Sequence, residues 1–234
     1  MPLYVLISLV PAWLRAEGVG LKEIGLFSLI GLPYVWKFLW SPLLDRYSLP
    51  LLLYRPGLRR SWMLSTQLLL LITIAMLGFL DPLINLWHIA WLCLGIALLS
   101  ATQDIVLDAY RRQILPDQEL GLGNSIHVNA YRVAGLVPGS LSLILSDFLP
   151  WDIVFLVTSA FVLVGLILTL SVSEPTSKHN QPTTLKAAII DPFDDFFSRQ
   201  GVQQAFLILI FMLLYKLGDS MATALATPFY LDMG

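Results

Sequence analysis

The sequence predicts an all-α membrane protein with several membrane-spanning helices. Of its 234 residues, 57% are hydrophobic and only 13% are charged, and the mean hydropathy is +0.75. Soluble domains average about 25% charged residues, so this chain lacks the polar surface that a globule of its size needs. In addition, the apolar residues gather into long runs that polar segments separate. We therefore expect the lipid bilayer to surround most of the chain.

Six apolar runs are long enough to be membrane spans, because a helix needs about 20 mostly apolar residues to cross a bilayer. The opening stretch, residues 1–13, is apolar but shorter, and we interpret it as part of a helix. This order predicts a transmembrane block at 1–172 with a truncated first helix, a central loop at 173–203, and the truncated first helix of a next block at 204–234. The six predicted spans lie at about 21–44, 61–80, 88–113, 122–146, 151–172 and 204–230.

The basic residues give the predicted orientation in the membrane, because Lys and Arg gather in cytoplasmic loops. The opposite loops hold only Arg15 and Lys22. We therefore place the basic loops, and the central loop with them, in the cytoplasm. Nine basic residues fall in alternate loops: Arg46, Arg55, Arg59, Arg60, Arg111, Arg112, Lys178, Lys186 and Arg199.

The central loop contains one segment that favours a helix. Asp191 and Pro192 are a good N-cap and first-turn pair. Phe193, Phe196 and Phe197 then follow at helical spacing, opposite charged residues. This pattern is typical of a short amphipathic helix that lies on the membrane surface, although a plain linker is the alternative.

Charge and cysteine content exclude some classes of function. The net charge of −2 argues against a nucleic-acid partner, because binding phosphates requires a concentrated basic face. Cys93 is the only cysteine, so an intramolecular disulfide is impossible. We expect no metal and no cofactor.

Charged side chains inside the predicted spans are the candidate functional residues, because each costs about 2.5–3.5 kcal/mol at the bilayer centre on insertion scales. Asp104 and Asp108 are four residues apart, and Arg111 follows on the same helix face. Two carboxylates one turn apart disfavour the doubly charged form, which suits reversible protonation. The alternative is an Asp108–Arg111 pair near the cytoplasmic end that only tethers helices.

Arg132 belongs to a polar stripe in the next predicted span. Ser125, Asn129 and Arg132 share one helix face, which should line a cavity or meet the aspartates of the preceding helix. The alternative is an ion pair between Arg132 and an aspartate that only fastens two helices. His127 lies elsewhere on the helix and favours a packing role over proton transfer.

Three further ionisable residues lie within predicted spans. Lys216 and Asp219 are three residues apart in the last span and either neutralise each other or line a cavity. Lys37 lies between Trp36 and Trp40, only eight residues before Asp45 at the cytoplasmic end. It therefore either serves the pathway or extends toward the lipid headgroups.

Several strings of residues resemble one transporter family. The segment from Ser41 to Tyr47, which includes Asp45 and Arg46, and the later Gly57-Leu58-Arg59-Arg60 resemble the loop between helices two and three of the major facilitator superfamily. Pro42 departs from the usual glycine, and the loop before Arg59 is longer. Three strings narrow the resemblance to the AmpG-type muropeptide permeases: residues 34–47, Ser100–Val106 (with Gln103 and Asp104) together with Asp108-Ala109, and Leu214–Asp219.

This resemblance implies a major facilitator fold with twelve or more helices, of which this chain would supply most of the N-terminal six-helix half, the central loop and helix seven. It also implies import of anhydromuropeptides, sugar–peptide fragments of the cell wall, across the bacterial inner membrane, together with protons and without enzymatic activity. By the same resemblance, Asp45, Arg46, Arg59 and Arg60 would form a cytoplasmic gate. A proton and substrate pathway would use Lys37, Gln103, Asp104, Asp108, Arg132, Lys216 and Asp219.

Three alternatives remain open at this point. Acetyl-CoA transporters belong to the same wider family and share its Gln-Asp and Lys-Leu-Gly-Asp features. An intramembrane aspartyl protease is favoured only by Leu217-Gly218-Asp219 with a second aspartate at Asp104, and it lacks the family's partner Tyr-Asp. A membrane scaffold that transports nothing would leave the charges inside the spans without a purpose.

Overall fold

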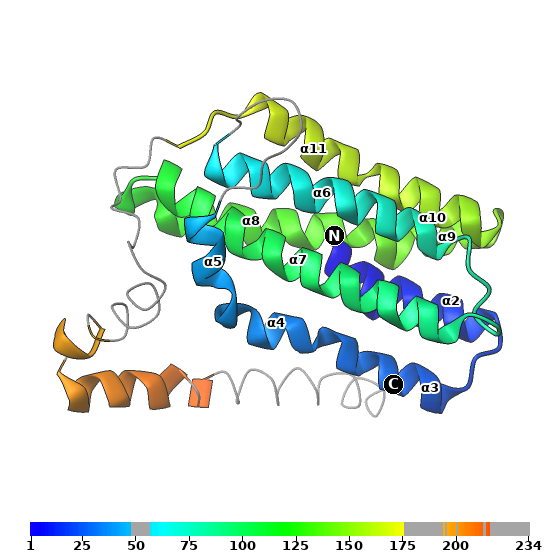
Figure 1. Ribbon diagram of the computed structural model, residues 1–234, viewed down its shortest axis with the longest axis horizontal. Coiled ribbons are helices and arrows are strands. Elements are labelled where there is room, and N and C mark those ends of the chain that lie inside the picture. The colour runs from blue at the N-terminus through cyan, green and yellow to red at the C-terminus, as the bar shows by residue number, and fades with distance from the viewer. Residues whose placement is uncertain (48–56, 176–193, 195, 200, 213, 216–234) are drawn as a thin grey trace, which may run out of the picture. The chain divides into compact units, whose positions relative to one another are not determined.

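The computed structural model describes residues 1–47, 57–175, 194, 196–199, 201–212 and 214–215. Its chain divides into two compact units, residues 1–181 and 182–234. All regular structure in the described part is helical (Figure 1). The predicted all-α class is therefore confirmed for these residues.

Four helices of the first unit are long and apolar enough to cross a membrane. The predicted spans at 61–80, 88–113, 122–146 and 151–172 correspond to Leu58–Leu77, Leu86–Ile114, Asp117–Ser146 and Trp151–Ser171. The first two are the continuous helices α6 (Leu58–Leu77) and α7 (Leu86–Ile114). The third consists of η4 (Asp117–Glu119), α8 (Leu120–Leu136), η5 (Val137–Leu141) and α9 (Ser142–Ser146), and the fourth of α10 (Trp151–Ala160) and α11 (Val162–Ser171).

The predicted span at 21–44 is helical but is not one continuous helix. Two 3₁₀ turns interrupt it, and Pro33 and Pro42 follow these turns at the start of the next helical piece. Proline has no N–H to donate to the preceding turn, so the helix changes its winding there. The pieces are α3 (Leu21–Phe27), η2 (Ser28–Gly31), α4 (Leu32–Trp36), η3 (Lys37–Leu39) and α5 (Ser41–Arg46).

Proline also accounts for the two π-helical turns. Pro138 lies inside η5, and Pro11 follows η1 (Val5–Leu9), which joins α1 (Pro2–Tyr4) to α2 (Val10–Ala16). A missing N–H is accommodated by a locally wider turn. Residues 2–16 together form a short apolar helix, as expected for the opening stretch.

The core of the first unit lies where α2, α6, α7 and α10 meet. Trp13, only 1% exposed, packs edge-on against Phe155 with ring centroids 4.9 Å apart. α6 contacts α7, α10 and α11, and Figure 1 shows it running beside α11. Gly78 permits the close approach of α10, since a Cβ there would lie 2.8 Å from the Asp152 backbone. Small residues at such contacts are typical of membrane helices.

The second unit is described only in part. An apolar helix runs over Val202–Met212, and Phe196 and Phe197 lie in one helical turn with ring centroids 5.6 Å apart. Asp191, Pro192 and Phe193, on which the predicted surface helix depends, lie outside the described residues. The predicted surface helix, the division at 172 and 203, and the remainder of the span at 204–230 stay predictions.

Candidate functional site

One face of α7 carries the polar residues of the candidate site. Ser100, Asp104, Asp108 and Arg111 are spaced by four, four and three residues, which places them along one side of the continuous helix. Ser100 is 4% exposed, whereas Asp108 is exposed. The face therefore changes from buried to accessible along the helix.

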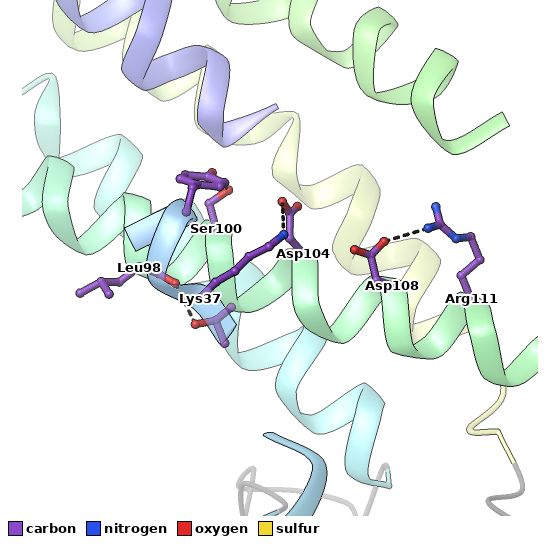
Figure 2. Close-up of polar contacts among 8 residues, drawn as sticks. Lys37, Leu98, Ser100, Asp104, Asp108 and Arg111 are labelled. Atoms are coloured by element: carbon purple, nitrogen blue, oxygen red, sulfur yellow. Dashed lines mark hydrogen bonds and ion pairs between the residues drawn. The ribbon is translucent and has the colours of Figure 1, made fainter. Parts of the chain in front are cut away.

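The segment α4–η3–α5 meets this face through three polar contacts. The Tyr34 hydroxyl donates to Ser100 Oγ at 2.5 Å, and Trp40 Nε1 donates to Thr102 Oγ1 at 3.1 Å. Between them, Lys37 Nζ lies 3.8 Å from Asp104 Oδ2. Figure 2 shows the two side chains pointing toward one another. Lys37 thus extends toward Asp104, which favours a place in the pathway over the alternative of an extension toward the lipid headgroups.

The Lys37–Asp104 pair is accessible. The side chains are 35% and 42% exposed, so the pair is only partly shielded from a solvent or a ligand. The charge of Asp104 also interacts with His127 on α8. Asp104 is therefore paired with one lysine and remains accessible to a second partner.

Asp108 has a different partner from Asp104. Its Oδ1 accepts a hydrogen bond from the Arg111 guanidinium at 2.9 Å (Figure 2). Both residues belong to α7, so this pair joins one turn to the next and does not fasten two helices. The pair with Arg111 that the sequence left open for Asp108 is present but does not tether two helices, and a role of Asp108 in a pathway stays a prediction.

Arg132 and Gln103 have no polar partner among the described residues. Arg132 is exposed on α8, and no ion pair joins it to Asp104 or Asp108 within the described part of the chain. The predicted meeting of this arginine with the aspartates of the preceding helix is therefore not observed. Gln103 lies half-buried beside Asp104 on α7. Their roles in a pathway stay predictions.

The predicted gate residues form a second cluster at the start of α6. Arg59, whose side chain is 7% exposed, contacts Asp45 Oδ1 at 2.7 Å and donates through Nε to Gln113 Oε1 at 3.3 Å. Arg60 donates to the carbonyl oxygens of Thr169 and Leu170 at the end of α11, at 3.2 and 3.1 Å. Asp45 and the two arginines thus join α5, α6, α7 and α11. The side chain of Arg46 lies outside the description.

Glu174 is a residue of this cluster that sequence reasoning did not assign to the site. Its carboxylate accepts hydrogen bonds from the backbone N–H groups of Arg59 and Arg60 at 2.8 and 3.0 Å, which caps the N-terminus of α6. Gly57 makes room for it, since a Cβ there would lie 2.3 Å from the Glu174 side chain. The available signal was an acid just after one span and a glycine just before another, but the sequence does not show that they meet.

Lys216 and Asp219, the last two predicted pathway residues, lie outside the described residues. Within the described ranges, no group of three or more His, Cys, Asp or Glu side chains is arranged to hold a metal ion. The described site consists of ion pairs and hydrogen bonds among buried, partly buried and exposed groups.

Comparisons with known proteins identify the family of this chain. The model of the Major Facilitator Superfamily matches residues 1–234. The chain is 45% identical to the anhydromuropeptide permease of Escherichia coli K12 over 98% of its length, and 50% identical to an uncharacterized protein of Haemophilus influenzae over 100%. It is also 30% identical, over its whole length, to putative transporter AmpG 4 of Rickettsia felis. The resemblance to AmpG-type permeases that the sequence motifs predicted is confirmed.

These matches extend over only part of each relative. The chain spans 45% of the E. coli permease, 55% of the H. influenzae protein and 57% of the R. felis protein, which is about half the length of the curated relatives. The family match nevertheless extends from the first residue of the chain to the last. With its apolar helices and this match, the chain is a membrane protein that belongs to the major facilitator superfamily.

Proposed function

We propose that the full-length protein imports anhydromuropeptides across the bacterial inner membrane as a proton-coupled, multi-pass transporter, with this chain as its N-terminal part. The observation that carries the proposal is the 45% identity to the E. coli anhydromuropeptide permease across 98% of the chain. The relatives are named as a permease and as transporters, which supports a transporter and does not favour the acetyl-CoA carrier, protease or scaffold alternatives.

The Lys37–Asp104 pair supplies the proposed coupling step. When a proton binds Asp104, the carboxylate loses its charge and its attraction for Lys37. Lys37 is then free to bind an anionic group of the substrate, such as a peptide carboxylate. Both side chains are more than a third exposed, which supports access of a proton and of a substrate group to the pair. Alternating access would then release both on the cytoplasmic side.

The cluster around Arg59 is proposed to be the cytoplasmic gate. Arg59 and Asp45 form a short ion pair that ties α5 to α6, and Arg60 ties α6 to the end of α11. In one state of the transport cycle these contacts hold the cytoplasmic ends of the helices together. Arg46 remains part of the proposed gate, and Arg132, Gln103, Lys216 and Asp219 remain proposed pathway residues.

The test is uptake by the full-length protein in proteoliposomes. Labelled anhydromuropeptide is supplied outside, and accumulation is compared with and without an inward proton gradient. The native protein is expected to accumulate substrate only with the gradient. Asp104→Asn is expected to lose gradient-driven accumulation by about tenfold or more, a difference of ~1.4 kcal/mol, but to keep exchange of external for internal substrate.

A matched control is Asp147→Asn, which neutralises an exposed aspartate in the turn after α9, outside the site. It should accumulate substrate as the native protein does. Native protein that takes up no anhydromuropeptide would overturn the substrate assignment. Full accumulation by Asp104→Asn would leave the transporter standing but would remove the proton role of this residue.

A further inference from the structure

Three tyrosines from three separate segments gather near the Lys37–Asp104 pair. Tyr4 of α1 and Tyr131 of α8 have ring centroids 5.1 Å apart at an interplanar angle of 45°. Gly135, one turn beyond Tyr131, makes this contact possible, since a Cβ there would lie 2.6 Å from the Tyr4 ring. The two rings are therefore tilted against one another over a glycine on α8.

Tyr34 brings the third ring to the charged pair. Its hydroxyl donates to Ser100, which lies one turn before Asp104 on α7, and its own segment continues to Lys37 one turn later. The charge of Asp104 acts on the hydroxyls of both Tyr34 and Tyr131, which places these two tyrosines near the same carboxylate. We call Tyr4, Tyr34 and Tyr131 the tyrosine cluster.

The tyrosine cluster differs from the aromatic core of the same unit. Trp13 and Phe155 are fully buried and apolar, as packing residues are. The three tyrosines are only half-buried, and the neighbouring Lys37 and Asp104 are 35% and 42% exposed. Accessible aromatic rings beside a few polar groups are the usual lining of a small-molecule site. Packing alone does not require three hydroxyl-bearing rings at an intramembrane ion pair.

From this arrangement we propose that the tyrosine cluster is the sugar-binding subsite of the transporter. The face of an aromatic ring is electronegative and attracts the C–H groups on one face of a pyranose ring. Tyrosine hydroxyls can also donate to or accept from sugar hydroxyl and N-acetyl groups. The adjacent Lys37 would receive an anionic group of the attached peptide. This inference rests on the proposed function and assigns its sugar recognition to residues that sequence reasoning did not select.

The test separates the sugar from the peptide. Uptake of labelled anhydromuropeptide by the full-length protein is inhibited with the peptide-free disaccharide, and its inhibition constant is measured for the native protein and for variants. The disaccharide should inhibit the native protein. Tyr131→Leu and Tyr4→Leu remove an aromatic face and are expected to raise the inhibition constant about fivefold or more, whereas Tyr131→Phe keeps the face and should change it less than about twofold.

Trp91→Leu is the matched control, because it removes an aromatic ring of α7 that is 69% exposed and outside the cluster. It should leave the inhibition constant unchanged. If both leucine variants reach normal membrane abundance and keep the native inhibition constant, the sugar subsite is overturned. The proposed function would still be upheld by uptake in the native protein. Absence of uptake by the native protein would overturn both.

A second measurement needs no variant and therefore does not depend on variant folding. The native full-length protein is photolabelled with a diazirine derivative of the disaccharide, and the labelled peptides are identified by mass spectrometry. Labelling that excess unlabelled disaccharide suppresses is expected in the peptides that contain Tyr4, Tyr34 or Tyr131. Suppressible labelling confined to other segments would overturn the proposal.

Discussion

Lys37 shows how a single charged residue in a span acquires its partner. Two tryptophans flank it in the sequence, and the cytoplasmic end of its segment is near, so an extension toward the headgroups was a real alternative. The structure instead places its ammonium group 3.8 Å from Asp104. Because both side chains are more than a third exposed, solvent screening leaves the pair a small contribution to stability. Under the proposed coupling step, this small contribution lets the pair break when Asp104 takes up a proton.

The first prediction separates this role from a purely structural one. Lys37→Met is expected to lower uptake about tenfold or more, while the melting temperature of the solubilised full-length protein changes little, because a partly exposed pair contributes only about 0–1 kcal/mol. Lys37→Arg keeps the positive charge and should retain part of the uptake. Uptake and thermal melting are measured on the same preparations.

The double variant Lys37→Met with Asp104→Asn gives the decisive comparison. If the pair serves transport, the double variant is as inactive as either single variant. The opposite result would be a Lys37→Met variant with a much lower melting temperature, and a double variant that recovers both the native melting temperature and uptake. That result would show that the pair only supports the fold.

Gly57 is the second residue with a sharp structural requirement. Its φ of 93° and ψ of 176° belong to a region that only glycine occupies readily, and the Glu174 side chain fills the space where a Cβ would be. Gly57→Ala should therefore destabilise the protein by about 1–3 kcal/mol. The measurement is chemical or thermal unfolding of the solubilised protein.

Gly95→Ala is the control for that substitution. Gly95 lies inside α7, and a Cβ there would meet no atom within 4 Å. Alanine favours a helix by about 0.8–1.0 kcal/mol over glycine, so this variant should be as stable as the native protein or more stable. Equal stability of the two alanine variants would contradict the requirement at Gly57.

At the scale of elements, Glu174 links the start of α6 to the residues that follow α11. Its carboxylate satisfies two backbone N–H groups at the N-terminus of α6, where the helix dipole also favours a negative charge. Glu174→Ala should cost about 1 kcal/mol, as loss of other helix caps does. Glu174→Gln keeps an acceptor oxygen but loses the charge, so it should cost less than the alanine variant. Thermal unfolding of the two variants checks this order.

The control for the cap is Glu119→Gln, which neutralises an exposed acid between α7 and α8. It should unfold as the native protein does. If Glu174→Ala had the same melting temperature as this control, solvent would replace the carboxylate at no cost in stability.

The elements also show what the sequence could and could not predict. Hydrophobic run length located four long helices to within a few residues, because length and polarity are properties of the local sequence. The breaks in the segment from Leu21 to Arg46 were missed, although Pro33 and Pro42 stand at both of them. A window that averages hydropathy does not register that a proline lacks an N–H. The two helix breaks were therefore not predicted from hydropathy, although the prolines indicate them.

Pairing between elements is where sequence reasoning ended. Lys37 and Asp104 were both candidates, but their pairing was not predicted. Arg132 was expected to line a cavity or to meet the aspartates, and it is exposed without an ion pair to them among the described residues. A helical repeat places Ser100, Asp104 and Asp108 on one face of α7, but it does not say which neighbouring helix meets that face. The tyrosine cluster and the Glu174 cap were not predicted for the same reason, because each joins residues that are far apart in the chain.

For the whole molecule, the distribution of basic residues predicts its orientation. Arg59 donates to Gln113, so the start of α6 and the end of α7 lie at the same end of the bundle. Arg60, Arg111 and Arg112 belong to these same helix ends. The turn between α6 and α7 lies at their other ends, and its residues carry no basic side chain. Positive charge gathers in cytoplasmic loops, so this turn should face the periplasm.

Cysteine labelling in intact cells tests that orientation in the full-length protein. Ile84→Cys lies in the turn between α6 and α7 and replaces a residue that is 80% exposed. Asp117→Cys lies beyond α7 and replaces a side chain that is 81% exposed. A membrane-impermeant maleimide is expected to label the former in intact cells and the latter only after permeabilisation. Cys93 is fully buried and should contribute no labelling from this chain. The reverse pattern would invert the protein in the membrane, place the Arg59 cluster outside, and remove the basis for a cytoplasmic gate.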